Sequence, residues 1–171
     1  ALNHLNLTIE DGQIVGLIGH NGAGKSKNIK SLVSVITPTT GRILVDGKDL
    51  YNNRLEIKKK IGYWADSPDL FLRLTANEFW ELVATSYDMN QQECDDRLEQ
   101  LLHLFDFTSH RYEVIESFSH GMRQKVFVIG ALLSDPDIWV LDEPMTGLDP
   151  QASYDLKQMM REHADKGNTV I

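Results

Sequence analysis

The stretch Gly-His-Asn-Gly-Ala-Gly-Lys-Ser at residues 19–26 decides how this sequence is expected to fold. A short apolar run at 14–18 precedes it and has the composition of a strand that is covered on both faces. A segment with apolar residues at helical spacing, 29–36, follows it. Glycine, four residues, glycine, lysine and serine between a strand and a helix form the phosphate-loop pattern. The alternative, a flexible glycine turn, is disfavoured by these flanking elements.

Each part of the loop 19–26 is expected to contribute to phosphate binding. Backbone N–H groups and the positive end of the helix dipole converge on the anion, and glycine permits the close approach that a Cβ would block. We expect Lys25 to reach the β- and γ-phosphates and the Ser26 hydroxyl to ligate Mg²⁺. The residues assigned to a nucleotide on this basis are Gly19, His20, Asn21, Gly22, Ala23, Gly24, Lys25 and Ser26.

Two adjacent acids, Asp142 and Glu143, follow the apolar run 138–141. The run predicts a core strand, which places the acids at its carboxyl end, beside the phosphate loop. We expect Asp142 to hold Mg²⁺ through water and Glu143 to orient or deprotonate the water that attacks the γ-phosphate. The alternative is a helix or turn cap, because Pro144 and Gly147 follow. Together with the phosphate loop, the catalytic interpretation is favoured.

The rest of the chain predicts strands at both ends and helices between them. Residues 5–9 alternate apolar and polar, which is typical of a half-buried edge strand. Residues 42–45 predict a strand that enters a two-residue turn at Asp46 and Gly47. Residues 61–64 predict another short strand. Thr75 and Glu78 form a capping-box pattern. Helices are expected from Thr75 through Val83, around 98–105, and over about 121–133 and 152–164, and a further strand begins at Thr169.

Composition limits the domain organisation and the setting. The chain has 171 residues, of which 42% are apolar and 25% charged, so a single folded domain is expected. Its net charge of −8 disfavours nonspecific binding to nucleic acid, and an anionic ligand therefore needs a local positive site. The single cysteine, Cys94, favours a reducing, cytoplasmic setting. No apolar stretch is long enough to span a membrane, so a membrane role would need another subunit.

A third motif lies between the phosphate loop and the acids, at residues 118–124, Phe-Ser-His-Gly-Met-Arg-Gln. By itself it reads as an ordinary helix start with Ser119 as N-cap. In its place before the strand 138–141, however, it resembles the signature motif of ABC-type ATPases. The ordered set of phosphate loop, helical insertion, signature, acidic pair and Thr146–Asp149 resembles the nucleotide-binding subunit of an ABC transporter over practically the whole chain.

The resemblance implies one α/β domain over 1–171, truncated at both ends. It is expected to be a phosphate-loop NTPase core with a mixed sheet and antiparallel edge strands, at about 1–66 and 136–171, and an inserted α-helical subdomain at about 67–135. The adenine-stacking aromatic residue and the switch histidine of the family would lie before Ala1 and after Ile171.

The resemblance also implies ATP and Mg²⁺ as cofactors and a second ATP-binding subunit, in a homo- or heterodimer. The signature of one subunit would cap the γ-phosphate on the other. The residues that it adds to the nucleotide site are Lys27, Ser119, His120, Gly121 and Asp149. A transmembrane permease is the expected further partner, with the chain in the cytoplasm, peripheral on the inner face of the membrane, and no nucleic acid is expected.

Three positions depart from the usual family pattern. Lys27 replaces a hydroxyl residue, His120 replaces a glycine, and Asp66 stands where a glutamine near the γ-phosphate is typical. Asp66 is assigned to the catalytic group, with an exposed loop acid as its alternative. Asp66, together with residues 120–123 and 142–149, is similar to the subgroup that serves ABC-2-type exporters, so an exporter ATPase is predicted. A soluble ABC-type ATPase acting on nucleic acid or the ribosome, and a sensor that binds ATP without turnover, are the alternatives.

Overall fold

The computed structural model describes residues 5–20, 23–64 and 71–171, and it divides into two compact units. Unit 1 comprises residues 1–63, 136–142 and 161–171, and unit 2 comprises residues 64–135 and 143–160. Each unit has its own buried core. The boundaries of the core and the helical subdomain given above stay a prediction.

A three-stranded sheet organises unit 1, in the order β3-β4-β5. Its strands are β3 (Ile61–Trp64), β4 (Ile138–Leu141) and β5 (Thr169–Val170). Strands β4 and β5 are parallel, with Ile138 opposite Thr169 and Trp139 opposite Val170. The run 138–141 is therefore the buried strand that its composition predicts, and Asp142 follows directly at its carboxyl end.

An antiparallel hairpin joins β1 (Leu44–Val45) to β2 (Lys48–Asp49). Asp46 and Gly47 connect the two strands with φ angles of 51° and 75°. Positive φ at both central residues matches a type I′ turn, whose twist suits adjoining strands. The predicted hairpin is confirmed, and with the parallel β4–β5 pair and the helices it gives the expected α/β class with an antiparallel element.

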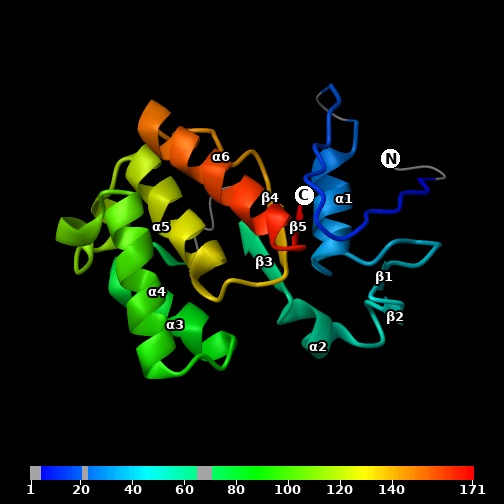
Figure 1. The fold of residues 1–171 in the computed structure, drawn as a ribbon, viewed down its shortest axis with the longest axis horizontal. Coiled ribbons are helices and arrows are strands. Elements are labelled where there is room, and N and C mark those ends of the chain that lie inside the picture. Colours follow the sequence, from blue (N-terminus) through cyan, green and yellow to red (C-terminus); the bar gives the residue numbers. More distant parts are fainter. Residues whose placement is uncertain (1–4, 21–22, 65–70) are drawn as a thin grey trace. The chain divides into compact units, whose positions relative to one another are not determined.

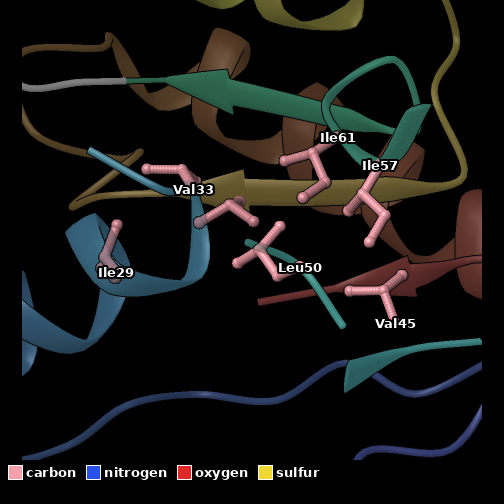
Figure 2. Packing of buried hydrophobic residues seen from close by; sticks show 7 residues of the cluster. Ile29, Val33, Val45, Leu50, Ile57 and Ile61 are labelled. Atoms are coloured by element: carbon pink, nitrogen blue, oxygen red, sulfur yellow. The ribbon is translucent and has the colours of Figure 1, made fainter. Parts of the chain in front are cut away.

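The apolar core of unit 1 forms where α1 (Lys25–Leu32) and α2 (Arg54–Lys58) pack with residues from the strands. Figure 2 labels six members of this cluster, and Val140 of β4 completes it. These members are Ile29, Val33, Val45, Leu50, Ile57 and Ile61. Their burial holds the start of α1 on the sheet scaffold, because apolar area removed from water is the main stabilising term.

Unit 2 is built mainly from helices α3 (Ala76–Ser86), α4 (Gln91–Leu104) and α5 (His120–Leu133), with the first part of α6 (Pro150–Asp165). Both α3 and α4 pack against α5, as the green and yellow ribbons of Figure 1 show. The indole Nε1 of Trp80 donates a hydrogen bond to the Val126 carbonyl oxygen (2.9 Å), which joins α3 to α5. Cys94, on α4, is buried.

Two predicted strands at the start of the chain are wrong. Residues 5–9 form no strand, and Leu5 and Leu7 are more than half exposed. In the run 14–18 only Ile14 makes a β-bridge, parallel to Val170, and the Ile18 side chain is 99% exposed. The backbone pairing of this run is confined to its start, where the Val15 N–H donates to the Val170 carbonyl (2.8 Å) and the Val170 N–H donates to the Gln13 carbonyl (2.9 Å).

Candidate active site

The phosphate loop leads into α1, with Gly24 as its N-cap. Gly24 has φ 94°, in the left-handed region that favours glycine, and the turn closes through the Asn28 N–H donating to the Gly24 carbonyl (3.0 Å). A glycine cap offers no side-chain acceptor, so the N–H groups of the first turn are left for another acceptor. This is the geometry that binds phosphate at a helix start.

Positive charge gathers at this helix start. The first turn carries Lys25 and Lys27 and no acidic residue. The Lys25 ammonium donates to the carbonyl oxygens of Gly19 (2.5 Å) and His20 (3.3 Å), so it lies over the loop itself. The Ser26 and Lys27 side chains are exposed. The loop therefore supplies the local positive site that a chain of net charge −8 needs for an anion.

The two acids are positioned by the end of β4. The Leu141 N–H donates to the Ile171 carbonyl (2.8 Å), which fixes the strand end, and Asp142 after it is half-buried. Glu143 is exposed and has φ 53°, a conformation uncommon for a residue with a side chain. Such backbone strain persists where the surrounding structure holds it, and it gathers at functional sites. Asp142 belongs to unit 1 and Glu143 to unit 2.

The signature segment begins α5, in unit 2. Ser119 is the N-cap, and its hydroxyl oxygen accepts from the Met122 N–H (3.3 Å). The cap predicted for Ser119 is thus present, and the residue is exposed at a helix start that lacks acids. The Arg123 guanidinium donates to the Glu116 carbonyl (2.5 Å), which ties the helix start to the segment before it.

The loop after Glu143 lies directly against this helix start. A Cβ at Gly121 would lie 2.4 Å from the Gly147 carbonyl oxygen, so a side chain at position 121 would push the loop away. A Cβ at Gly147 would lie 2.8 Å from the His120 ring carbon Cδ2. The His120 ring therefore faces this loop, and the two glycines allow the backbones to meet.

Asp149, the last residue of this loop, caps α6. Its carboxylate accepts from the Ala152 N–H (2.8 Å) and pairs with the Lys125 ammonium of α5 (2.9 Å). The Ala152 N–H first, and then Lys125, hold the pKa of the Asp149 carboxyl below its usual value. Asp149 thus stays ionised at neutral pH and keeps both contacts.

The predicted site residues fall into two groups. Unit 1 holds the described loop residues, Gly19, His20 and Ala23–Lys27, together with Asp142, and unit 2 brings Ser119, His120 and Gly121 together with Asp149. Asn21, Gly22 and Asp66 lie outside the described residues. Lys125 was not predicted. Its spacing is the available signal, because a residue four positions after Gly121 lies on the same helix face.

The described residues contain neither a cluster of metal ligands nor a membrane-spanning helix. Within residues 5–20, 23–64 and 71–171, no three His, Cys, Asp or Glu side chains gather as metal ligands. In the same ranges, no helix has the length and apolar character needed to cross a bilayer.

A family model and the relatives of this chain agree on one protein family. The family model described as ABC transporter matches residues 2–146. The ABC transporter ATP-binding protein NatA of Bacillus subtilis is 36% identical over 172 aligned residues, which cover 100% of this chain and 70% of that protein. The bacitracin transport ATP-binding protein BcrA of Bacillus licheniformis is 32% identical, over 100% of this chain and 55% of that protein.

Solved structures show the same fold. A structure described as the ATP-binding subunit of an ABC transporter matches with a TM-score of 0.89 and 34% identity, over 96% of this chain and 69% of that one. A dimeric ATP-binding cassette in a post-hydrolysis state, bound to ADP and Pi, matches with a TM-score of 0.85 and 25% identity, over 97% of this chain and 76% of that one. These matches confirm the phosphate-loop NTPase fold.

Proposed function

The chain belongs to the ATP-binding proteins of ABC transporters, a family of ATPases, and from this premise we propose how its own residues bind and hydrolyse ATP. One observation carries the proposal: a glycine-capped helix start, with Lys25 over the loop carbonyls and no acid in the first turn. N–H groups of the loop and α1 hold the phosphates, and Lys25 turns from the loop carbonyls to the β- and γ-phosphate oxygens.

Mg²⁺ fits the side chains proposed to hold it. The Ser26 hydroxyl is exposed in the first turn of α1, and the Asp142 carboxylate follows β4, so both are hard oxygen donors of the kind that Mg²⁺ prefers. A site with few protein ligands suits this ion, which keeps several waters and is bound partly by phosphates. When bound, Mg²⁺ would neutralise charge on the β- and γ-phosphates.

We assign the general base to Glu143. Its carboxylate would accept a proton from the attacking water, or orient that water, while the loop holds the leaving phosphates. Glu143→Gln keeps the shape of the side chain but cannot accept the proton. We expect this variant to bind ATP normally and to lose most turnover, measured by phosphate release and by calorimetry. Parental turnover would contradict the assignment and direct attention to another acid.

We propose that two such subunits close on the nucleotide. Ser119, His120 and Gly121 of one subunit would face the γ-phosphate held by the other, and Asp149 would lie in the loop that crosses the interface. The exposed Ser119 at the acid-free start of α5 supports this, because such a helix start favours an anion. The ADP- and Pi-bound relative described as dimeric supports it also. ATP-dependent dimerisation of the Glu143→Gln variant, followed by light scattering, tests it.

We propose export as the direction of transport and a transmembrane permease as the further partner, which would place the chain at the inner face of the membrane. The similarity of Asp66 and His120 to the exporter subgroup supports export, and the relative named for bacitracin transport supports a transport role. The alternative, an ATPase acting on nucleic acid or the ribosome, is not favoured by transporter relatives. Copurification from membranes tests the partner: a six-helix permease is expected, and association with ribosomes instead would contradict it.

A further inference from the structure

The Lys125 ammonium connects three helices of unit 2. It lies on α5, and its Nζ is 2.9 Å from the Asp149 carboxylate, which caps α6. The same Nζ donates to the carbonyl oxygen of Phe105 (3.0 Å), the C-cap residue of α4. The Lys125 side chain is only 18% exposed, so water competes weakly for these contacts. The Lys125 ammonium therefore donates to the backbone carbonyl at the end of α4 and binds the Asp149 carboxylate at the start of α6.

The loop between Glu143 and Asp149 is short and folded on itself. The Thr146 N–H donates to the Glu143 carbonyl (3.0 Å), and the Leu148 N–H donates to the Met145 carbonyl (3.3 Å). Because two consecutive hydrogen-bonded turns keep this loop compact, a displacement of Asp149 would also displace the backbone of Glu143. Glu143 itself has φ 53°, a strained conformation that the attached loop must maintain.

Asp149 is held in place from two sides. Its carboxylate accepts from Ala152, and its backbone carbonyl accepts from the Ser153 N–H (2.9 Å), so it is fixed to α6. The contact with Lys125 then fixes this capped helix start to α5. At its middle, the loop rests against Gly121 through the Gly147 carbonyl. Lys125 thus secures the far end of a loop whose near end is the proposed base.

We propose that Lys125 is a positioning residue for Glu143, acting through Asp149 and the loop between them. This inference rests on the proposed function, in which Glu143 is the base. Without the Lys125 ammonium, the Phe105 carbonyl and the Asp149 carboxylate lose a shared partner, and the Asp149 end of the loop is no longer tied to α5. Misplacement of a catalytic group by about 1 Å can cost roughly 100-fold in rate, even when the mutated residue is far from the chemistry.

The test compares Lys125→Met with the parent in the purified ATP-binding subunit. Methionine has a similar length but no charge and no donor. We expect kcat to fall by about 10- to 100-fold with the KM for ATP unchanged, because the phosphate loop is a separate segment. Lys125→Arg, which keeps the charge and several donors, should recover most of the rate. Lys157→Met, which removes an exposed lysine of α6, is the matched control and should turn over normally.

A second variant, Asp149→Asn, tests the same contact in case Lys125→Met does not fold. Asp149→Asn keeps a capping side chain but removes the charge that Lys125 binds. It should also lower kcat, and in the double variant the two effects should be less than additive, because both substitutions break one contact.

The outcomes separate three cases. A lower melting temperature with parental kcat would show that Lys125 is merely structural and would overturn the inference. Parental kcat in Asp149→Asn, or additive effects in the double variant, would overturn it as well. If Glu143→Gln kept parental turnover, the proposed base itself would be wrong, whatever the Lys125 variants did.

Discussion

At the scale of single residues, we expect binding of an anionic nucleotide to depend on Lys25, because a net charge of −8 repels anions from the chain as a whole. The compact ammonium donates to the carbonyl oxygens of the loop that is proposed to hold the phosphates. We expect Lys25→Ala to abolish measurable Mg·ATP binding in calorimetry. Lys30→Ala, which removes an exposed lysine from the last turn of α1, should bind like the parent. Unchanged affinity in Lys25→Ala would refute the phosphate-loop assignment.

Asp66 is the second residue with a measurable prediction, although it lies outside the described residues. A carboxylate near the γ-phosphate attracts metal but repels phosphate, and at about 6 Å and an effective dielectric near 20 a unit charge pair is worth about 3 kcal/mol. We expect Asp66→Asn to need a different Mg²⁺ concentration for half-maximal ATPase activity. Superimposable Mg²⁺ titrations of the parent and Asp66→Asn would leave Asp66 as a surface acid.

At the scale of elements, the start of α3 carries a pH-dependent contact. The Thr75 hydroxyl oxygen accepts from the Glu78 N–H, and the Glu78 carboxylate accepts from the Thr75 N–H (2.8 Å) and hydroxyl (2.9 Å), so the predicted capping box is confirmed. The backbone N–H first, and the hydroxyl second, hold the pKa of the Glu78 carboxyl below its usual value. A carboxyl with a lowered folded-state pKa contributes stability above its unfolded pKa, and the contribution is lost as pH falls through the folded value.

Glu78→Gln tests this contact, because glutamine keeps the capping geometry without the charge. We expect the parent to be the more stable protein at pH 7 and the difference to be smaller at pH 2.5, where more of the carboxyl is protonated. The measurement is the free energy of unfolding from urea titrations at both pH values. An equal difference at pH 7 and pH 2.5 would mean that the carboxylate charge contributes nothing to the cap.

Local patterns predicted the elements whose stability is local. The Asp46-Gly47 turn and the Thr75 cap each depend on neighbouring residues, and each forms as expected. The run 14–18 was predicted as a strand but pairs only at Ile14, because pairing depends on a segment far away in the sequence, which the composition of the run does not specify. In the candidate site, sequence motifs predicted the loop, the acids and the signature. The Lys125–Asp149 pair escaped prediction because its partners lie on α5 and at the start of α6, which only the packing of the two helices brings together.

At the scale of the whole molecule, nucleotide binding should stabilise the fold. A ligand that binds only the native state adds RT ln(1 + [L]/Kd), about 2.7 kcal/mol when its concentration is about 100 times Kd. We expect Mg·ATP to raise the free energy of unfolding of Glu143→Gln by this amount, and this variant is chosen because it should not consume the ligand. The Lys25→Ala variant is the control and should show no rise. Binding in calorimetry without stabilisation would indicate that the unfolded chain binds ATP as well.

The buried Cys94 thiol of α4 has a practical consequence for measuring the proposed approach of two subunits. Burial first, and then the charge of Asp95, raise the pKa of the Cys94 thiol, so little reactive thiolate is present at neutral pH. Because the sequence has no other cysteine, the natural chain should give little background with maleimide dyes. Tyr154→Cys, at a side chain that is 58% exposed on α6, would then accept a single fluorophore. Energy transfer between dyes on two subunits would report their approach as ATP is added.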